Sequence, residues 1–483
     1  MQTIAWPLQF PDDMLMDSRH HRTEHKLGLN WLCTFVSLLT WMFIGTSQAL
    51  ARADCDWPAA EVRQDDTKQL AGFEPSEAAL IEDGQPFTWA DELVIRLLYR
   101  APKLPATTLQ ASAQPLDVDS LKGLISEPTR HRLDVFRIVG QLVYVERAPQ
   151  RAGAWTELPQ AFLCRIKLHD RTIRVIVTDF PSVLLDGDRL DEPVSIDAFF
   201  ARVQPDEHSM DASGPHEMQP SIPLFVGARL GWFPNRLDPA RGVGEGQVIL
   251  ARHGFDLGLL EVVRKHNRQP LTKTDRPAFD AMLKAAADAA KSTLTTLPTA
   301  GHVDLFGILG ESQQHLGDWV ELEGNVKRVV PWVWRGDDGS TIEYCQVDLF
   351  VPLGDGSVRL RGADGQDLVF RGRFPVTCHV PQSLGPGEDW VGRRLVVRGF
   401  FYRLWSYESA LTGEQRLASG QLSPLVLAAS VTLVEVNEET VGQWLTWIMI
   451  GLLLSVAAMV SLYYGLDRRR KLSRTLPESI SIP

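Results

Sequence analysis

Several short stretches of this sequence carry residue types that can do chemistry, and most of them have a simpler explanation. The acidic run at 186–192 could gather oxygen ligands for Ca²⁺, although an ordinary acidic turn has the same composition. The glycine-rich run at 242–246 lacks the spacing of a phosphate-binding loop and does not follow a buried strand, so we interpret it as a linker. No HExxH, GxSxG, P-loop or kinase motif occurs in the chain. We therefore predict no enzyme activity, no catalytic residue, no metal site and no cofactor.

Two stretches combine aromatic side chains with arginine, which is typical of binding surfaces because these residues bury a large area with few rotatable bonds. The residues concerned are Trp332, Trp334, Arg335, Arg403, Trp405 and Tyr407. Aromatic rings also stack on sugars. We predict that these side chains form a binding surface for envelope proteins or glycans. The alternative is that the tryptophans cover a barrel mouth or rest on a lipid surface, where tryptophan is favoured.

The elements that position these residues follow from an internal repeat. Five β-rich segments occur twice in the same order, and the offset between copies is 184, then 181, then 200 to 201 residues. The clearest pair matches 194–202, with Phe199, Phe200 and Arg202, to 395–403, with Phe400, Phe401 and Arg403. Each segment is short, β-branched and aromatic, and turn residues bound it. The sequence therefore predicts two five-stranded β modules.

Five strands in about 100 residues are similar to an OB-fold, a small Greek-key barrel. The helix that usually lies between the third and fourth strands is missing, so a small β-sandwich stays open as the alternative. In an OB-type barrel the loops that join strands one to two and four to five lie together and bind ligands. The predicted binding residues fall at those loops in the second copy.

Helical stretches flank the β modules. The stretch Thr88-Trp-Ala-Asp91 can cap a helix with Leu93, Leu97 and Leu98 on its apolar side, ending near Ala101-Pro102. The stretch 255–266 has helical spacing, and Asp275 can cap a further helix with Phe279 and Met282 on one face. These apolar faces are interpreted as packing surfaces. The fold class is therefore α+β.

A membrane segment is predicted at 444–466, where no charged residue interrupts a run long enough to cross the hydrocarbon core as a helix. Arg468, Arg469, Arg470 and Lys471 follow it, whereas glutamates precede it. Because basic residues favour the cytoplasmic side, the tail is predicted to be cytoplasmic and most of the chain extracytoplasmic.

The N-terminus carries a second apolar run. Residues 27–45 follow a basic stretch and precede Ala49-Leu50-Ala51, which is the layout of a signal peptide. Cleavage would leave a single-pass protein of the bacterial inner (cytoplasmic) membrane, whereas retention would leave a two-pass protein. Four of the five cysteines then face an oxidising compartment, where either disulfides or buried thiols are compatible with the sequence.

The domain organisation follows from these elements. It comprises a leader and signal segment at 1–53, a helical region at 54–130, a first β module at 131–234, a helical linker region at 235–316, a second β module at 317–436, the membrane helix at 444–466 and a tail at 467–483. The arrangement resembles uncharacterised membrane proteins of planctomycete-like bacteria, and the resemblance implies no activity.

These features predict a membrane-anchored binding or scaffold protein of the bacterial envelope. The net charge of −11 argues against a nucleic-acid partner, because phosphate binding depends on lysine and arginine. One alternative is an assembly factor whose membrane helix contacts a membrane complex, with Gly451, Ser455 and Ala458 allowing close packing. A second alternative is an unrecognised envelope hydrolase.

Overall fold

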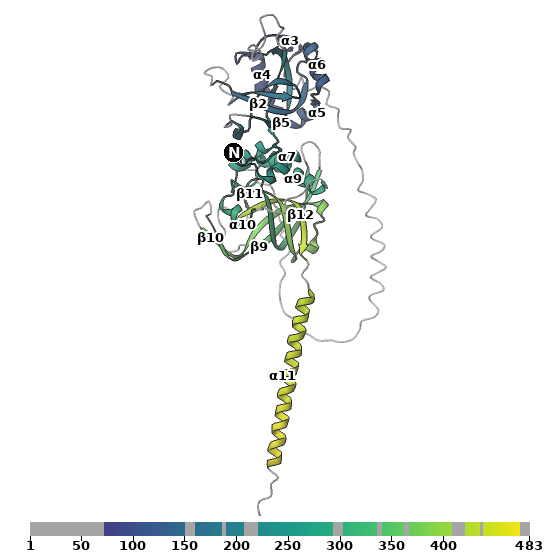
Figure 1. Ribbon diagram of the computed structural model, residues 1–483, viewed down its shortest axis with the longest axis vertical. Helices are drawn as coiled ribbons and strands as arrows, with labels where there is room; N and C mark the ends of the chain where they lie inside the picture. Colours follow the sequence, from purple (N-terminus) through teal and green to yellow (C-terminus); the bar gives the residue numbers. More distant parts are fainter. Residues whose placement is uncertain are drawn as a thin grey trace, which may run out of the picture. The chain divides into compact units, whose positions relative to one another are not determined.

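The computed structural model describes residues 72–149, 160–185, 190–206, 221–292, 303–335, 341–361, 367–407, 421–434 and 438–473. Contacts within the chain divide it into two compact units, and each is described by itself. The first unit comprises the described residues within Met1–Asp179 and Ser195–Leu230, and the second comprises those within Phe180–Val194 and Gly231–Pro483. The fold is α+β, with two mixed β-sheets and flanking helices (Figure 1).

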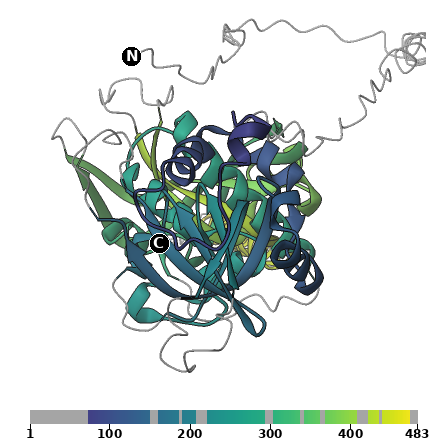
Figure 2. The same ribbon diagram turned by 90° about the horizontal axis from the view of Figure 1, so that it is seen from above.

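The first sheet has the strand order β1-β2-β3-β4-β6-β5-β7, with a further pairing between β2 and β5. The elements of this part of the chain are α3 (Pro75–Ala78), α4 (Glu92–Arg100), α5 (Ala106–Ser112), β1 (Gln114–Pro115), α6 (Val118–Ser126), β2 (Val135–Arg147), β3 (Phe162–Leu168), β4 (Arg171–Val177), β5 (Glu192–Pro205), β6 (Ser221–Gly227) and β7 (Gly231–Trp232). The helices, purple to dark blue in Figure 2, lie beside these strands.

The second sheet closes into a barrel in the order β10-β12-β11-β8-β9. Its elements and neighbours are α7 (Glu245–Arg252), α8 (Leu260–Lys265), α9 (Arg276–Lys291), α10 (Leu305–Gly310), β8 (Trp319–Arg335), β9 (Thr341–Arg361), β10 (Asp367–Pro381), β11 (Arg394–Tyr407), β12 (Gln421–Val434) and α11 (Glu438–Ser473).

The two sheets pair five strands in the same way. In both, the third strand runs parallel to the fifth, β4 with β6 and β10 with β12, whereas the fourth and fifth strands are antiparallel. Irregularities in the ladders also match: one falls between Phe200 and Arg202 in β5 and another between Phe401 and Arg403 in β11. The backbone therefore follows the same path in both sheets at these points.

Helix α4 forms as its sequence predicts. The side chain of Asp91 accepts a hydrogen bond from the Val94 amide, and the helix ends at Ala101. Leu97 and Leu98 are fully buried, because they face the core of the first unit. The helix and its apolar face are confirmed, and within the predicted capping stretch Thr88–Asp91 it is Asp91 that caps the helix.

Helix α9 also begins after its predicted aspartate, but Asp275 makes no capping bond to the helix. Its carboxylate accepts from the amide and the hydroxyl of Thr272 at 2.7 and 2.8 Å instead. The carboxylate of Asp275 therefore faces the loop before α9 rather than the free amides at the start of the helix.

The glycine-rich run is not the linker that the sequence suggested. Gly244 is the N-cap of α7, and Gly246 lies within that helix. A Cβ atom at Gly246 would lie 2.5 Å from the Gly317 carbonyl oxygen and 2.5 Å from the Trp319 amide nitrogen. Glycine is needed here because α7 approaches this backbone closely.

The interior of the barrel follows from strand alternation. Along β9, Cys345, Val347 and Leu349 are buried, whereas Gln346 and Asp348 between them are partly exposed. Because successive side chains of a strand point to opposite faces, the buried set faces inward and the polar set outward. The described cysteines, Cys164, Cys345 and Cys378, are buried free thiols.

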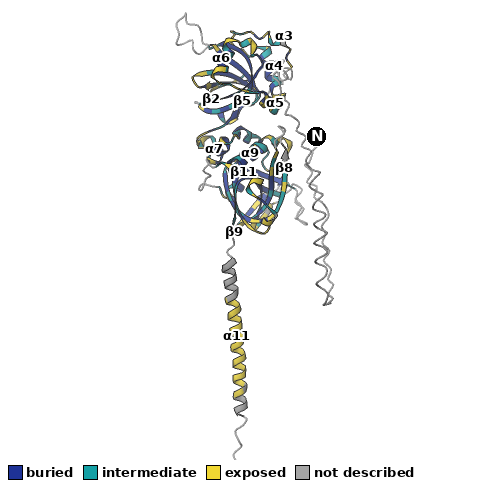
Figure 3. Ribbon diagram, turned by 90° about the vertical axis from the view of Figure 1, so that its right-hand side faces the viewer, coloured by how far each residue is buried: buried dark blue, intermediate teal, exposed yellow. Residues whose placement is uncertain are grey.

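Helix α11 differs from every other described helix. Its segment Trp447–Leu466 is 20 residues long and apolar enough to cross a membrane, and none of it is buried within the protein. Figure 3 shows the helix as exposed along this segment. Hydrophobic side chains of this number are rarely exposed to water in a soluble domain, so α11 is compatible with a membrane anchor.

Candidate functional site

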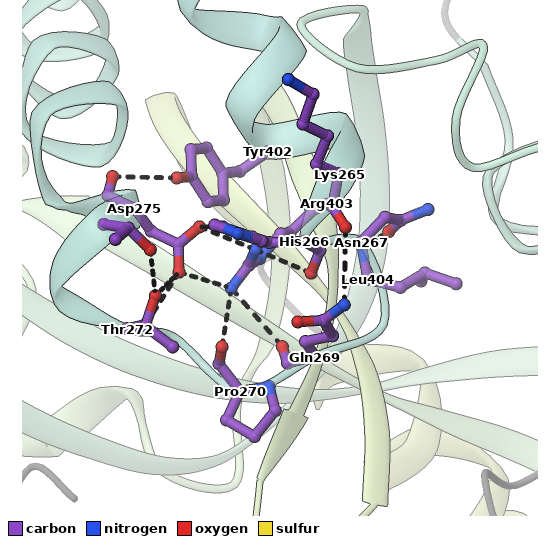
Figure 4. A network of polar contacts seen from close by, with 11 residues as sticks. Lys265, His266, Asn267, Gln269, Pro270, Thr272, Asp275, Tyr402, Arg403 and Leu404 are labelled. Carbon is purple, nitrogen blue, oxygen red and sulfur yellow. Dashed lines mark hydrogen bonds and ion pairs between the residues drawn. The ribbon is translucent and has the colours of Figure 1, made fainter. Parts of the chain in front are cut away.

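Arg403 is not part of a binding surface, and this corrects the prediction made from the sequence. Its side chain is 0 % exposed and forms a two-point ion pair with Asp275, with Nη1–Oδ1 at 2.9 Å and Nη2–Oδ2 at 3.2 Å (Figure 4). Aromatic neighbours in the sequence suggested an exposed anchor. The partner that withdraws Arg403 from solvent lies 128 residues earlier in the chain.

Both Nη atoms of Arg403 also donate to backbone carbonyl oxygens, whereas its buried Nε has no hydrogen-bond partner among the described residues. Nη1 donates to the His266 carbonyl oxygen at 2.8 Å, and Nη2 donates to the Pro270 carbonyl oxygen at 3.0 Å. His266 Nδ1 lies 2.8 Å from Asp275 Oδ1. Figure 4 shows how this network ties the segment before α9 to strand β11. Its role is therefore structural: it fixes the start of α9 on the barrel.

The row of residues that crosses the outer face of the barrel begins at Arg403. Across the ladders, Arg403 pairs with Leu425, Leu425 with Thr377, Thr377 with Asp348, and Asp348 with Arg328. Directly paired residues of a sheet share a face. The side chains of Arg328 and Asp348, at the other end of this row, therefore also point outward from the barrel.

Arg328 and Asp348 form the polar centre of this face. Their closest charged atoms are 2.8 Å apart, and Gln346 Nε2 donates to Asp348 Oδ1 at 3.0 Å. Both charged side chains are partly exposed. Sequence reasoning missed these residues, because only the register of β8 against β9 places them opposite one another.

Trp405 and Tyr407 lie on the same outward face, two and four residues beyond Arg403. Their rings stack at a centroid distance of 5.0 Å with 23° between planes. Trp405 is only 8 % exposed and pairs across the ladder with the small, buried Ser423. Burial raises the pKa of Tyr407 to about 12, with Asp348 adding to the rise and Arg328 opposing it. Tyr407 therefore lies within the field of the Arg328–Asp348 pair.

The remaining predicted residues belong to the end of β8. Trp332 is half-buried and pairs with Tyr344, and its indole N–H has no hydrogen-bond partner among the described residues. The side chains of Trp334 and Arg335 lie outside the described part of the structure. Of the six predicted residues, the structure thus brings Trp405 and Tyr407 together on one face.

We name the set Arg328, Gln346, Asp348, Trp405 and Tyr407 the outer-face cluster. It offers a carboxylate, a guanidinium, an amide and an aromatic ring on rigid strands. These groups can bind a polar ligand that also has a planar or apolar part.

His379 does not add chemistry to this cluster. It is buried beneath α9, with Tyr344 stacked against it at 4.9 Å and Phe279 edge-on at 5.2 Å. Burial lowers its pKa to about 3, so the ring is neutral near neutral pH. His379 is therefore a neutral side chain that packs between two aromatic rings and belongs to the buried core.

The acidic run at 186–192 has one member whose role is clear. Glu192 is buried, and its carboxylate accepts from Arg241 Nη1 at 2.7 Å and from the Trp232 indole at 3.0 Å. Arg241 neutralises the carboxylate and both donors occupy its oxygens, so Glu192 is not available to a calcium ion. Residues 186–189 lie outside the described residues.

Comparisons with known proteins identify no family. No protein-family model matches the chain, and no curated protein matches it. Among solved structures, the single-stranded DNA-binding protein of Thermus aquaticus is similar over 63 % of this chain and 93 % of that chain, at 10 % identity and a TM-score of 0.14. A replication protein A heterotrimer bound to single-stranded DNA is similar over 64 % and 51 %, at 8 % identity and a TM-score of 0.14.

A third similar structure is a putative aspartyl-tRNA synthetase of Leishmania major, which is similar over 58 % of this chain and 53 % of that chain, at 9 % identity and a TM-score of 0.16. The prediction that excluded a nucleic-acid partner is withdrawn: it rested on the net charge of the whole chain, and two of the proteins in this comparison bind single-stranded DNA. Net charge describes the whole chain, whereas a partner meets one face of it. At these TM-scores the likenesses support no shared function.

Proposed function

We propose that each sheet is an OB-like barrel and that the two arose by duplication of one module. The common strand pairings support this, and so do equivalent side-chain contacts. Arg202 pairs with the helix-capping Asp91 at 2.7 Å, as Arg403 pairs with Asp275. Each module also has a histidine bonded to the aspartate three residues later, His131 to Asp134 and His315 to Asp318.

We propose further that the protein is a membrane-anchored, extracytoplasmic binding or scaffold protein of the bacterial envelope. The observation that carries this is α11, whose apolar segment Trp447–Leu466 has no buried residue and is followed, after Asp467, by four basic residues. In this proposal the basic end stays in the cytoplasm and the two modules lie on the opposite side.

The proposed mechanism is an increase in local concentration. A protein held at the membrane samples a small volume, so a modest affinity of one barrel face is sufficient for capture. The outer-face cluster supplies the contacts in this proposal. Trp405 supports the face from beneath, whereas Tyr407, Arg328 and Asp348 meet the partner.

The anchor and its orientation can be tested on the full-length chain. Reporter enzymes active on only one side of the membrane are fused after Pro483 and within 408–420. We expect the C-terminal fusion to be active in the cytoplasm and the internal fusion outside it. An active external reporter after Pro483, or full-length protein in the aqueous fraction, would refute the anchored topology.

Binding is tested by crosslinking in native membranes followed by mass spectrometry. Arg328→Ala with Asp348→Ala removes both charges without leaving one unpaired, and we expect it to reduce crosslinked partners. The matched control is Arg398→Ala with Glu321→Ala, an ion pair elsewhere on the same barrel. A third variant, with 444–466 replaced by an unrelated membrane helix, tests the assembly-factor alternative. Loss of partners only in that third variant would favour the alternative.

A further inference from the structure

The second unit has a pair of strands that is longer than its counterpart in the first. β3 and β4 have 7 residues each, whereas the equivalent strands β9 and β10 have 21 and 15. β9 pairs with β8 only as far as Phe350, and β10 pairs with β12 only over Thr377–His379. Among the described strands, residues 351–361 and 367–374 therefore pair only with each other, and we name them the arm. Figure 2 shows its two green strands extending to one side.

The arm has one apolar face that is buried. Val358, Leu360 and Phe374 all lie on this face and are shielded from solvent. A Cβ atom at Gly356 would lie 2.8 Å from the ring of Phe306, so helix α10 contacts the arm at this glycine. Because apolar packing holds this face, the arm presents the opposite face, which we call its outward face, as a fixed surface.

The outward face of the arm carries arginines without an ion pair. Arg359 lies opposite Val369 and Ser357 lies opposite Arg371, so the two arginines are diagonal neighbours on one face. Both are exposed, and Val369 beside them is 48 % exposed. Within the part of the chain that the structure describes, neither arginine is in an ion pair. The positive charge of this face is therefore available to a partner.

A third arginine continues the outward face towards the barrel. Arg373 is exposed, and its guanidinium carbon lies 4.8 Å from the centre of the Phe350 ring. The described acidic residues of the arm lie at its two ends. Asp355 is in a stretch of β9 without a ladder partner, and Asp367 is at the tip. Between these ends, the charged side chains described on the outward face are all positive.

The outer edge of β10 in the arm is not paired with any described strand. Unpaired N–H and C=O groups along such an edge can pair with another extended chain, which is how a peptide adds to a sheet. Alternate side chains of an added strand point to one face at a spacing of about 6.7 Å. Carboxylates at every second position of a peptide would therefore lie beside the arginines of the outward face. A nucleic-acid strand stacks on exposed aromatic rings, whereas Arg373 covers Phe350.

We propose that the arm binds an extended acidic peptide along the outer edge of β10. The peptide backbone pairs with residues 367–374, and its alternate carboxylates accept hydrogen bonds from Arg359, Arg371 and Arg373. The side chains between the carboxylates are apolar and lie on the other face, beside Phe370. This site is separate from the outer-face cluster and does not require a membrane anchor.

The test uses full-length protein in detergent micelles and the fluorescence anisotropy of labelled peptides. The probe is a nine-residue peptide that alternates glutamate with valine. One control peptide has glutamine in place of each glutamate, and a second groups the same residues into a glutamate block and a valine block. We expect the alternating acidic peptide to bind at least tenfold more tightly than either control, and high salt to weaken it.

Pairing of the peptide backbone is tested with N-methylated forms of the same probe. An added strand directs the N–H groups of alternate residues towards its neighbour. N-methylation of one alternating set, either all the glutamates or all the valines, should therefore abolish binding. N-methylation of the other set should leave most of the affinity.

Variants of the protein assign the site to the arm. Arg359→Gln with Arg371→Gln should weaken binding of the acidic peptide by about tenfold or more, because charged hydrogen bonds are lost. Arg359→Glu with Arg371→Glu keeps the edge strand charged, which guards against aggregation, and should abolish binding. Arg264→Gln with Lys265→Gln removes the same charge from exposed positions on α8, so this matched control should have no effect.

Four results would overturn the site. The first is an equal loss of affinity in the α8 control and the arm variants. The second is unchanged binding of both N-methylated peptides. The third is binding of a twelve-residue oligothymidylate with no binding of the acidic peptide, which would indicate a nucleic-acid surface instead. The fourth is loss of the peptide in Arg328→Ala with Asp348→Ala, which would place it on the outer-face cluster. Failure of the arm and failure of that cluster are therefore distinguishable.

Discussion

At the scale of single residues, the same ion pair fastens a helix to the fourth strand in both units. Arg403 with Asp275 is fully buried, and Arg202 with Asp91 is nearly so. A buried ion pair stabilises the folded state little more than apolar side chains of the same volume would. Removing one partner, however, leaves an uncompensated buried charge. These arginines therefore specify where each helix starts on its sheet.

Arg403→Met should lower the free energy of unfolding of the second unit by about 3 to 5 kcal/mol, because Asp275 is left buried without its main partner. Chemical denaturation monitored by tryptophan fluorescence measures this. The control is Arg398→Met, which removes a half-exposed ion pair with Glu321 and should change stability by about 1 kcal/mol or less. Equal losses in the two variants would contradict the structural role of Arg403.

A pH dependence follows from His379. Its pKa is lowered in the folded state to about 3, so between that pH and about 6.5 the unfolded chain binds the extra proton. The resulting stability is fully present above about pH 6.5 and is lost progressively as the pH falls towards 3. His379→Phe should flatten this part of the stability curve, as measured by denaturation at a series of pH values. A stability curve whose slope between pH 3 and 6.5 is the same in His379→Phe as in the unchanged protein would contradict this assignment.

At the scale of elements, the sequence predicted helix α4 and the stretch Thr88–Asp91 that contains its cap, because capping residues and an apolar face both mark this helix. It also matched Arg202 to Arg403, and the ladders pair them with Leu224 and Leu425, the predicted equivalents. The repeat in the sequence, at its offset of 181, also matches Cys164 to Cys345, but the ladders show that this match is displaced by two residues. Cys164 pairs with Val145, and the residue that pairs with the equivalent Val329 is Val347.

That displacement has a physical reason. A shift of two residues leaves the inward and outward alternation of a strand unchanged, so the hydrophobic pattern does not distinguish the two registers. The outer-face cluster depends on this register, since it places Asp348 opposite Arg328. The aromatic residues of the candidate surface could therefore be predicted from the sequence, whereas its charged pair, Arg328 and Asp348, could not. Arg403 was misplaced for a related reason, because burial depends on contacts that are distant in the sequence.

The glycine in α7 gives a prediction at this scale. Gly246→Ala should destabilise the second unit by about 1 to 3 kcal/mol, because the new methyl group meets backbone atoms that cannot move aside. Gly310→Ala at the end of α10 is the matched control, since a Cβ there meets no atom within 4 Å. Thermal unfolding of the two variants distinguishes them, and an unaffected Gly246→Ala would refute the close approach of α7.

At the scale of the whole molecule, the described chain combines two β modules with one unburied apolar helix. Since the segment Trp447–Leu466 buries nothing in the protein, it contributes nothing to the core of either unit. Deletion of 438–483 should therefore leave the unfolding transitions of both units unchanged while releasing the protein from detergent. Calorimetry of the shortened and full-length chains tests this, and a lowered transition temperature would show that the helix has a folding partner.

The buried thiols have a practical consequence for both units. Cys164 is buried in the first unit, and Cys345 and Cys378 are buried in the second, so a maleimide reaches each one only when its own unit opens. The labelling rates of the cysteine-containing peptides, followed by mass spectrometry, would then report the opening of each unit separately. A substitution that destabilises one unit would raise the labelling rate of that unit's cysteines and leave the rate in the other unit unchanged.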